Sequence, residues 1–166
     1  MVDSPSSPSG LSVEASYRGV GSYHNNKTFL TKNAIKELWT HLSFTQLRFH
    51  CSKQQGRTFH VTTVTNSTGE AVVQYFSGQT NVQPDACGSF VRMENDDSKL
   101  AGACDQWGYW DDGKWGWRRR RDSLYYFPAG CYPYYWYLRT DGLDLRCDDH
   151  YHTEVCTGDF WKVFVR

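Results

Sequence analysis

The sequence lacks a net charge and lacks any long apolar run. Lysine and arginine together number 18, as do aspartate and glutamate, so no global field of one sign is present to attract nucleic acid or an anionic membrane surface. No apolar run approaches the roughly 18 residues that a helix needs to span a bilayer. We therefore expect neither nucleic-acid binding nor membrane insertion.

The sequence signatures of common enzyme families are missing as well. The chain contains no Gly-X-Ser-X-Gly, no His-Glu-X-X-His and no phosphate-binding loop. Two carboxylates brought together by folding are enough for glycoside hydrolysis, so a carboxylate-dependent hydrolase stays open as an alternative. The missing motifs favour a binding protein over an enzyme.

Cysteines and glycosylation sequons indicate the compartment. The six cysteines include no CxxC pair, which is typical of a disulfide framework in an oxidising environment. Asn26-Lys27-Thr28 and Asn66-Ser67-Thr68 are acceptor sequons, which are used on secreted chains. The sequence thus predicts a secreted protein, or one on the outer face of the cell surface, with Asn26 and Asn66 as glycosylation sites.

The spacing of the cysteines does not fix how they pair. Six cysteines allow many pairings, and the working hypothesis is Cys87–Cys104, Cys51–Cys147 and Cys131–Cys156. The first ten residues are rich in serine and proline and lack the apolar core of a signal peptide. We expect residues 1–10 to be a flexible leader and residues 11–166 to form a single extracellular β-rich domain.

One helix and several strands can be predicted from hydrophobic periodicity. Residues 33–42 favour a short helix, because Ile35, Leu38, Trp39 and Leu42 fall on one helical face. From position 44 onward the period changes to two, which is typical of a half-buried strand. Segments 57–65 and 70–77 are rich in Val, Thr, Phe and Tyr, and the intervening Asn66–Gly69 resembles a hairpin loop.

The remaining chain favours strands separated by turn residues. Gly, Pro, Asp or Asn bound each of these segments. The predicted strands are Ser89–Met93, Leu124–Phe127, Tyr134–Arg139, Leu143–Cys147 and Phe160–Val165. The predicted fold is all-β in the main: a disulfide-stabilised β-sandwich with one short helix near residues 33–42.

Aromatic residues crowd one region. Residues 107–137 hold thirteen aromatic side chains in 31 positions. Successive residues of a strand face opposite sides, so a sandwich core is not expected to take all of these rings. Exposed Tyr and Trp are suited to stacking on sugars or to anchoring a protein interface, whereas a second small core beneath a loop is the structural alternative.

The same region carries four consecutive arginines, Arg118 to Arg121. Guanidinium groups favour sulfated or carboxylated glycans, while a solvated loop neutralised by nearby aspartates is the alternative. Together with the aromatic residues, this run defines the predicted ligand-binding set: Trp110, Trp115, Trp117, Arg119, Arg120, Tyr135 and Trp136.

Carboxylates cluster in predicted turns. Calcium takes six to eight oxygen ligands, often from such turns, although Asp also favours turns for local hydrogen bonding. Calcium is therefore the one cofactor we predict. The predicted ligands are Asp96, Asp97, Asp148 and Asp149.

Several segments together resemble a module of secreted and cell-surface proteins of corals and sea anemones. The resemblance covers residues 38–166 and rests on Leu47–Val61, Asp85–Val91, Trp107-Gly108, Lys114–Gly116, Cys147–Asp149 and Gly158–Val163. In such proteins the module accompanies fibrinogen-like or other adhesive ectodomains, which implies recognition or adhesion. Cys51, Cys87, Cys104 and Cys147 match the pattern. Cys131 and Cys156 look like additions that would bond to each other.

These observations predict a secreted recognition module. Its expected activity is lectin-like carbohydrate binding through the aromatic and Arg-rich surface, assisted by calcium. An adhesive matrix domain that binds protein is the main alternative, and the carboxylate-dependent hydrolase is the second. The expected partners are glycans or extracellular proteins, and homo-oligomers would raise the avidity of weak single contacts.

Overall fold

The architecture is known from a computed structural model, which describes residues 2–3, 12–19, 28–108, 110, 112–116, 128–139, 144–149 and 158–166. Two α-helices and ten strands lie within these ranges, and a 3₁₀ helix spans Ala101–Gln106. The helices are α1 (Lys32–Leu42) and α2 (Ser67–Phe76). The strands are β1 (Val2–Asp3), β2 (Ser12–Glu14), β3 (Thr28–Leu30), β4 (Leu47–Ser52), β5 (Thr58–Thr63), β6 (Phe90–Arg92), β7 (Ala129–Cys131), β8 (Tyr134–Arg139), β9 (Asp144–Asp149) and β10 (Phe160–Val165).

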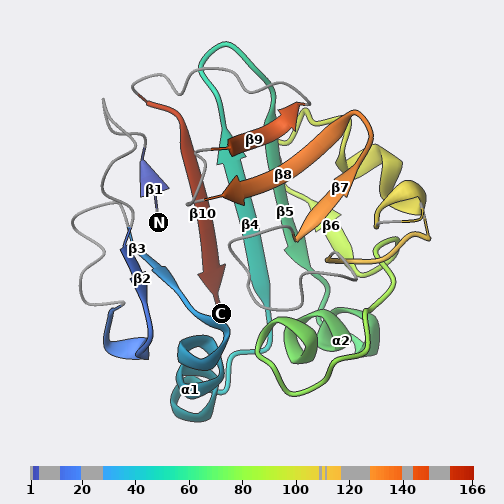
Figure 1. Cartoon of the computed structure of the whole chain (residues 1–166). Coiled ribbons are helices and arrows are strands. Elements are labelled where there is room, and N and C mark those ends of the chain that lie inside the picture. Colours follow the sequence, from blue (N-terminus) through green and yellow to red (C-terminus); the bar gives the residue numbers. More distant parts are fainter. Residues whose placement is uncertain are drawn as a thin grey trace.

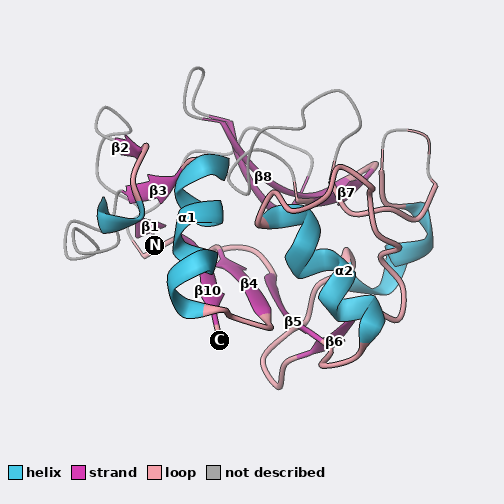
Figure 2. Cartoon of the chain, turned by 90° about the horizontal axis from the view of Figure 1, so that it is seen from below, coloured by secondary structure: helices cyan, strands magenta, loops and turns pink. Residues whose placement is uncertain are grey.

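Two antiparallel sheets form the body of the protein. The larger has the strand order β1-β10-β4-β5-β6, and the smaller has the order β7-β8-β9. In Figure 1, β8 and β9 run across the front of β4 and β5, and Figure 2 shows β7 and β8 on one side of the larger sheet. A short parallel pair, β2 and β3, lies beside them. The mainly β prediction is confirmed, whereas an aligned sandwich is not.

Strand β4 shows how the sequence sets the two faces of the larger sheet. Leu47, Phe49 and Cys51 are fully buried and point toward the smaller sheet. Arg48 and His50 alternate with them and lie on the opposite, partly exposed face. The period of two in the sequence therefore predicted both the strand and its buried face.

Helix α1 occupies the predicted place. Thr31 caps it, because its side chain accepts a hydrogen bond from the Ala34 amide at 3.2 Å. The helix ends at Ser43, whose left-handed backbone (φ 45°) turns the chain toward β4. Buried Ile35 and Leu38 attach the helix to the core.

Helix α2 replaces the predicted strand at 70–77, and the predicted hairpin loop is its N-terminus. Asn66 caps the helix by accepting hydrogen bonds from the amides of Thr68 and Gly69 at 3.1 and 3.3 Å. Val72 and Val73 pack into the core from the helix. The expectation of one helix was wrong because valines suited to a strand are buried here on a helical face.

Large aromatic side chains fill the space between the sheets. Trp107, Trp115, Trp136 and Trp161 are all 0 % exposed. The Phe49 ring lies 5.0 Å from that of Trp115 and 6.1 Å from that of Trp136. The T-shaped Trp107–Trp115 pair, at 4.9 Å, extends the cluster, so this core depends on edge-to-face ring packing.

Two disulfides confirm two of the predicted pairs. Cys51–Cys147 links β4 to β9 and so joins the two sheets, while Cys87–Cys104 closes a local loop that ends within the 3₁₀ helix. Cys131 is buried in β7. Its predicted partner Cys156 lies outside the described residues, so that pair stays a prediction.

Other features bear on the predicted organisation. Within the predicted leader 1–10 the structure describes only Val2–Asp3, which pair with β10. The predicted strand Leu124–Phe127 lies outside the described residues. Among the described helices, none is long and apolar enough to cross a membrane.

The two disulfides differ in the length of chain that they close. Cys51–Cys147 spans 96 residues and Cys87–Cys104 spans 17. In the loop-entropy account their removal costs about 4.7 and about 3 kcal/mol, respectively. We expect the double variant C51A/C147A to lower the free energy of unfolding in urea more than C87A/C104A does. A larger loss in C87A/C104A would contradict the role of Cys51–Cys147 as the main cross-link.

Candidate functional site

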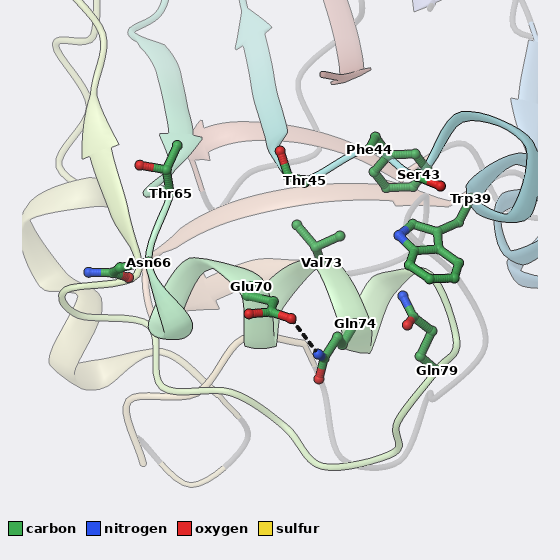
Figure 3. Close-up of a pocket in the computed structure, with 10 residues that line it drawn as sticks. All are labelled: Trp39, Ser43, Phe44, Thr45, Thr65, Asn66, Glu70, Val73, Gln74 and Gln79. Atoms are coloured by element: carbon green, nitrogen blue, oxygen red, sulfur yellow. Dashed lines mark hydrogen bonds between the residues drawn. The ribbon is translucent and has the colours of Figure 1, made fainter.

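A pocket lies between the C-terminal end of α1 and the flank of α2 (Figure 3). Its volume is about 290 Å³. The lining comes from α1, the turn that follows it, the end of β5, α2 and the chain just beyond α2. The lining residues are Trp39, Ser43, Phe44, Thr45, Thr65, Asn66, Glu70, Val73, Gln74 and Gln79.

The apolar part of the pocket follows from how the two helices end and begin. Trp39 lies on the last turns of α1, partly buried against the core. Its carbonyl accepts the Ser43 amide at 2.8 Å in the turn that ends the helix. After this turn Phe44 points inward at 3 % exposure, and Val73 of α2 is 2 % exposed. An indole and two buried side chains thus form an apolar surface beside solvent.

The polar part of the pocket comes from α2 and the residues after it. Glu70 and Gln74 are one turn apart, and the Gln74 side-chain amide donates to the Glu70 carboxylate at 3.0 Å, as the dashed line in Figure 3 shows. Gln79 lies below the Trp39 ring, and its amide donates to the Ser77 hydroxyl at 2.6 Å. These side chains therefore line the pocket that the indole borders with amide and carboxylate groups, and Gln79 lies nearest the indole.

A glycine brings α2 close enough to form this site. A Cβ on Gly69 would collide with the Val64 carbonyl oxygen, so only glycine allows the first turn of α2 to lie against the end of β5. This contact holds Glu70 and Val73 beside Thr65. The turn residues that suggested a hairpin thus position one wall of the pocket.

The pocket can bind a small polar ring but has one carboxylate. An aromatic face with nearby amides suits a ligand that has both C–H and hydroxyl surfaces. Glycoside hydrolysis uses two carboxyl groups, and Glu70 is the only one among the described lining residues. The pocket geometry therefore favours binding over hydrolysis at this place.

The predicted aromatic surface is in large part core. Trp115 and Trp136 are 0 % exposed and Tyr135 is 9 % exposed. The Trp115 indole donates to the Ser89 hydroxyl at 2.7 Å inside the protein. The structure therefore corrects the prediction that these three rings bind ligand. The space between the two crossed sheets takes in more aromatic side chains than a sandwich core was expected to hold.

Other members of the predicted ligand set have different positions. Trp110 is 64 % exposed and lies outside the core. Trp117, Arg119 and Arg120 lie outside the described residues, as does Asn26. Asn66 is exposed at the N-terminus of α2, with its side-chain oxygen used for capping.

Asp148 and Asp149 form ion pairs where β9 meets the turn between β4 and β5. Asp148 is 1 % exposed, pairs with Arg57, and accepts the amides of Lys99 and Leu100 at 3.0 and 2.6 Å. Asp149 pairs with Lys53 at 2.5 Å. Both carboxylates thus anchor chain segments to one another.

Asp96 and Asp97 hold the turn after β6 against β5. Asp96 pairs with Arg92 and accepts the His60 amide at 2.8 Å, while Asp97 accepts the Thr58 amide at 2.6 Å. No group of three or more metal-ligating side chains is present among the described residues. The structure thus assigns these four aspartates local contacts, and calcium binding stays a prediction.

A histidine pair occupies the outer face of the larger sheet. His50 of β4 lies opposite His60 of β5, and their rings stack at 3.7 Å with an interplanar angle of 9°. Burial is the largest cause that lowers the pKa of His50 from 6.5 to about 4, and the positive charges around it lower it further. Burial also lowers the pKa of His60, against the opposing hydrogen bond to Asn95.

The pocket was not predicted from the sequence, because one of its walls is formed by α2, a helix where a strand was expected. With residues 70–77 taken as a strand, Glu70 and Gln74 point to the same side but are not adjacent. The available signal was Asn66 as a helix cap followed by an acidic residue in the first turn.

Comparison with known proteins gave no match to any family model, curated protein or solved structure.

Replacing Asp148 by Asn tests its anchoring role. Asn tolerates the left-handed backbone at this position (φ 56°), so the substitution removes the charge without adding strain. We expect a loss of about 1.5–3 kcal/mol in the free energy of unfolding, because a buried charge-assisted network is weakened. The exposed Asp105→Asn serves as control, with a change within about 0.5 kcal/mol. Equal effects of the two substitutions in urea unfolding would refute the anchor.

The histidine pair predicts how stability depends on pH. Unfolded His50 takes up a proton near pH 6.5 and the folded residue near pH 4, so the free energy of unfolding falls as pH is lowered through this window. Solvent screening of the half-buried ring reduces the effect below the full pKa difference. We expect His50→Gln to flatten the pH profile of urea unfolding. Identical profiles for His50→Gln and the native chain would rule out this linkage.

Proposed function

We propose that the chain is a secreted recognition domain with lectin-like carbohydrate binding, and that its sugar site is the pocket between α1 and α2. One observation carries the proposal: the partly buried Trp39 ring, with Phe44 and Val73, forms an apolar side of a pocket whose remaining lining groups are amides, hydroxyls and one carboxylate. We regard the two crossed sheets as a sandwich that supports this site.

The chemistry of a sugar matches both sides of the pocket. The C–H face of a pyranose can stack on the apolar face of an indole, while its hydroxyl groups exchange hydrogen bonds with Gln74, Gln79 and Glu70. A volume of about 290 Å³ lies just below the about 300–1,000 Å³ common for ligand pockets. The pocket therefore suits one sugar unit, and multivalent display would supply avidity.

Disulfides support the extracellular part of the proposal. Cys51–Cys147 and Cys87–Cys104 are of the kind that persists in oxidising compartments. Membership of the coral and sea-anemone module is likewise proposed on the residue pattern, as is calcium assistance through the acidic turns. Each of these is independent of the pocket.

A protein-binding adhesive role is the second candidate. Trp110 and Tyr132 are 64 % and 71 % exposed, and both lie in the aromatic region that the sequence predicts as a binding surface. Exposed Trp and Tyr are enriched at protein interfaces. On this alternative the partner would contact Trp110, and sugar would not compete.

A glycan array, probed with and without a chelator, identifies the sugar, and Trp39→Ala then tests the pocket. We expect Trp39→Ala to weaken binding of the best array ligand by about 30-fold or more, because the stacking surface is lost. Trp110→Ala is the matched control and should bind as the native chain does. Loss of binding in Trp110→Ala with native binding in Trp39→Ala would place the site elsewhere.

A further inference from the structure

The outer face of the larger sheet gathers positive and aromatic side chains from three adjacent strands. Lys162 of β10, His50 of β4 and His60 of β5 lie in one row across the strands. Arg48 is two residues before His50 on β4 and opposite Phe164. The smaller sheet covers the other face, as Figure 2 shows, and these outer side chains, apart from His60, are only partly buried.

Three nitrogen atoms of the side chains on this outer face have no hydrogen-bond partner among the described residues. They are Arg48 Nε, His50 Nε2 and His60 Nε2, and all three are buried. His60 is 5 % exposed as a whole residue. Buried polar atoms are almost always satisfied, so unsatisfied groups gathered in one place call for an explanation, of which a bound water or ion is one.

The protonation of His60 follows from its neighbour. The Asn95 side-chain oxygen contacts His60 Nδ1, so Nδ1 carries the hydrogen and Nε2 is left as a bare acceptor in the neutral ring. A bare lone pair on His60 near Arg48 does not suit a cation, because the guanidinium charge repels it. Uptake of a proton would turn Nε2 into a donor, and an anion would stabilise that proton.

The aromatic residues orient the positive groups. The Arg48 guanidinium lies 4.5 Å from the centre of the Phe164 ring, and the Lys162 ammonium lies 4.6 Å from that of Phe160. Phe160 also meets the His50 ring edge-on at 4.6 Å. These contacts restrict the side chains and lower the entropy lost when they bind a ligand.

We propose that Arg48, His50, His60 and Lys162 form an anion site on the outer face of β10, β4 and β5, and that its ligand is a sulfate group of an acidic glycan. Sulfate presents four oxygens in a tetrahedral arrangement, so it can accept hydrogen bonds from donors that approach from several directions. A planar carboxylate of an acidic peptide presents two oxygens in one plane and satisfies fewer of these nitrogens.

The site binds more tightly as pH falls. The groups that face the histidine pair are Arg48 from β4, Lys162 from β10, and Asn95 and Asp96 from the turn after β6. The Asp96 carboxylate is already engaged by Arg92 and the His60 amide. Sulfate stays ionised between about pH 5.5 and about pH 7.5, so the proton that accompanies binding is taken up by the histidine pair.

This site goes beyond the proposed sugar pocket, because it lies on strands β10, β4 and β5 and uses none of the pocket residues. The two sites can therefore fail separately. Trp39→Ala should leave sulfate binding unchanged, and Arg48→Gln should leave binding of a neutral sugar unchanged.

The test uses the full chain with sodium sulfate, a sulfated dextran oligosaccharide, the same unsulfated oligosaccharide and a polyglutamate peptide. NMR of the imidazole protons reports binding at His50 and His60. We expect sulfate and sulfated dextran to shift both rings, with affinity rising about tenfold or more from about pH 7.5 to about pH 5.5. Unsulfated dextran should not shift them.

Variants separate this site from general electrostatic attraction. Arg48→Gln and Lys162→Gln should each weaken the binding of sulfated dextran by about tenfold. Lys36→Gln removes the same charge from an exposed position on α1 and should leave this binding unchanged. His50→Gln should reduce the pH dependence. If Arg48→Gln fails to fold, Lys162→Gln tests the proposal, and an imidazole spectrum like that of the native chain shows that this variant is folded. Equal weakening by Lys36→Gln, preference for polyglutamate, or unshifted histidine signals would overturn the proposal.

Discussion

Burial of indole rings between two crossed sheets is the constraint on which the other features depend. Trp107, Trp115 and Trp136 are fully enclosed, and Phe49 at the centre of β4 contacts two of them. Each such ring removes about 150–250 Å² from water, so burying these rings contributes strongly to the apolar stabilisation of the fold. The Cys51–Cys147 bond holds the two sheets together directly beside the cluster. One face of the larger sheet is committed to this core, and we propose that recognition uses its other face and the helix ends.

Much of the β architecture could be predicted from local pattern, and α2 could not. Strands β8 and β10 match the predicted bounds because alternation is a property of a single strand. At residues 67–76, β-branched valines favour a strand, while the Asn66 cap and packing against β5 favour a helix. Tertiary packing decided the outcome, and a sequence read one segment at a time contains little information about it.

The candidate site was predicted less well than the fold, for a related reason. The sequence showed an excess of aromatic rings at 107–137, and whether a ring is core or surface depends on how many layers surround it. The crossed second sheet supplies the layer that buries Trp115 and Trp136. By contrast, the pocket joins Trp39 and Gln74, which are 35 residues apart in sequence and belong to different helices. No local pattern connects them.

We propose that Trp39 contacts a sugar, whereas Trp107, Trp115 and Trp136 hold the fold. The most direct measurement is the ¹H–¹⁵N spectrum of the seven tryptophan indole groups. The protein is titrated with the neutral oligosaccharide that binds best on the glycan array. We expect the Trp39 signal to shift while the signals of Trp107, Trp115 and Trp136 stay in place. Movement of the core signals or of Trp110, with Trp39 unchanged, would contradict this proposal.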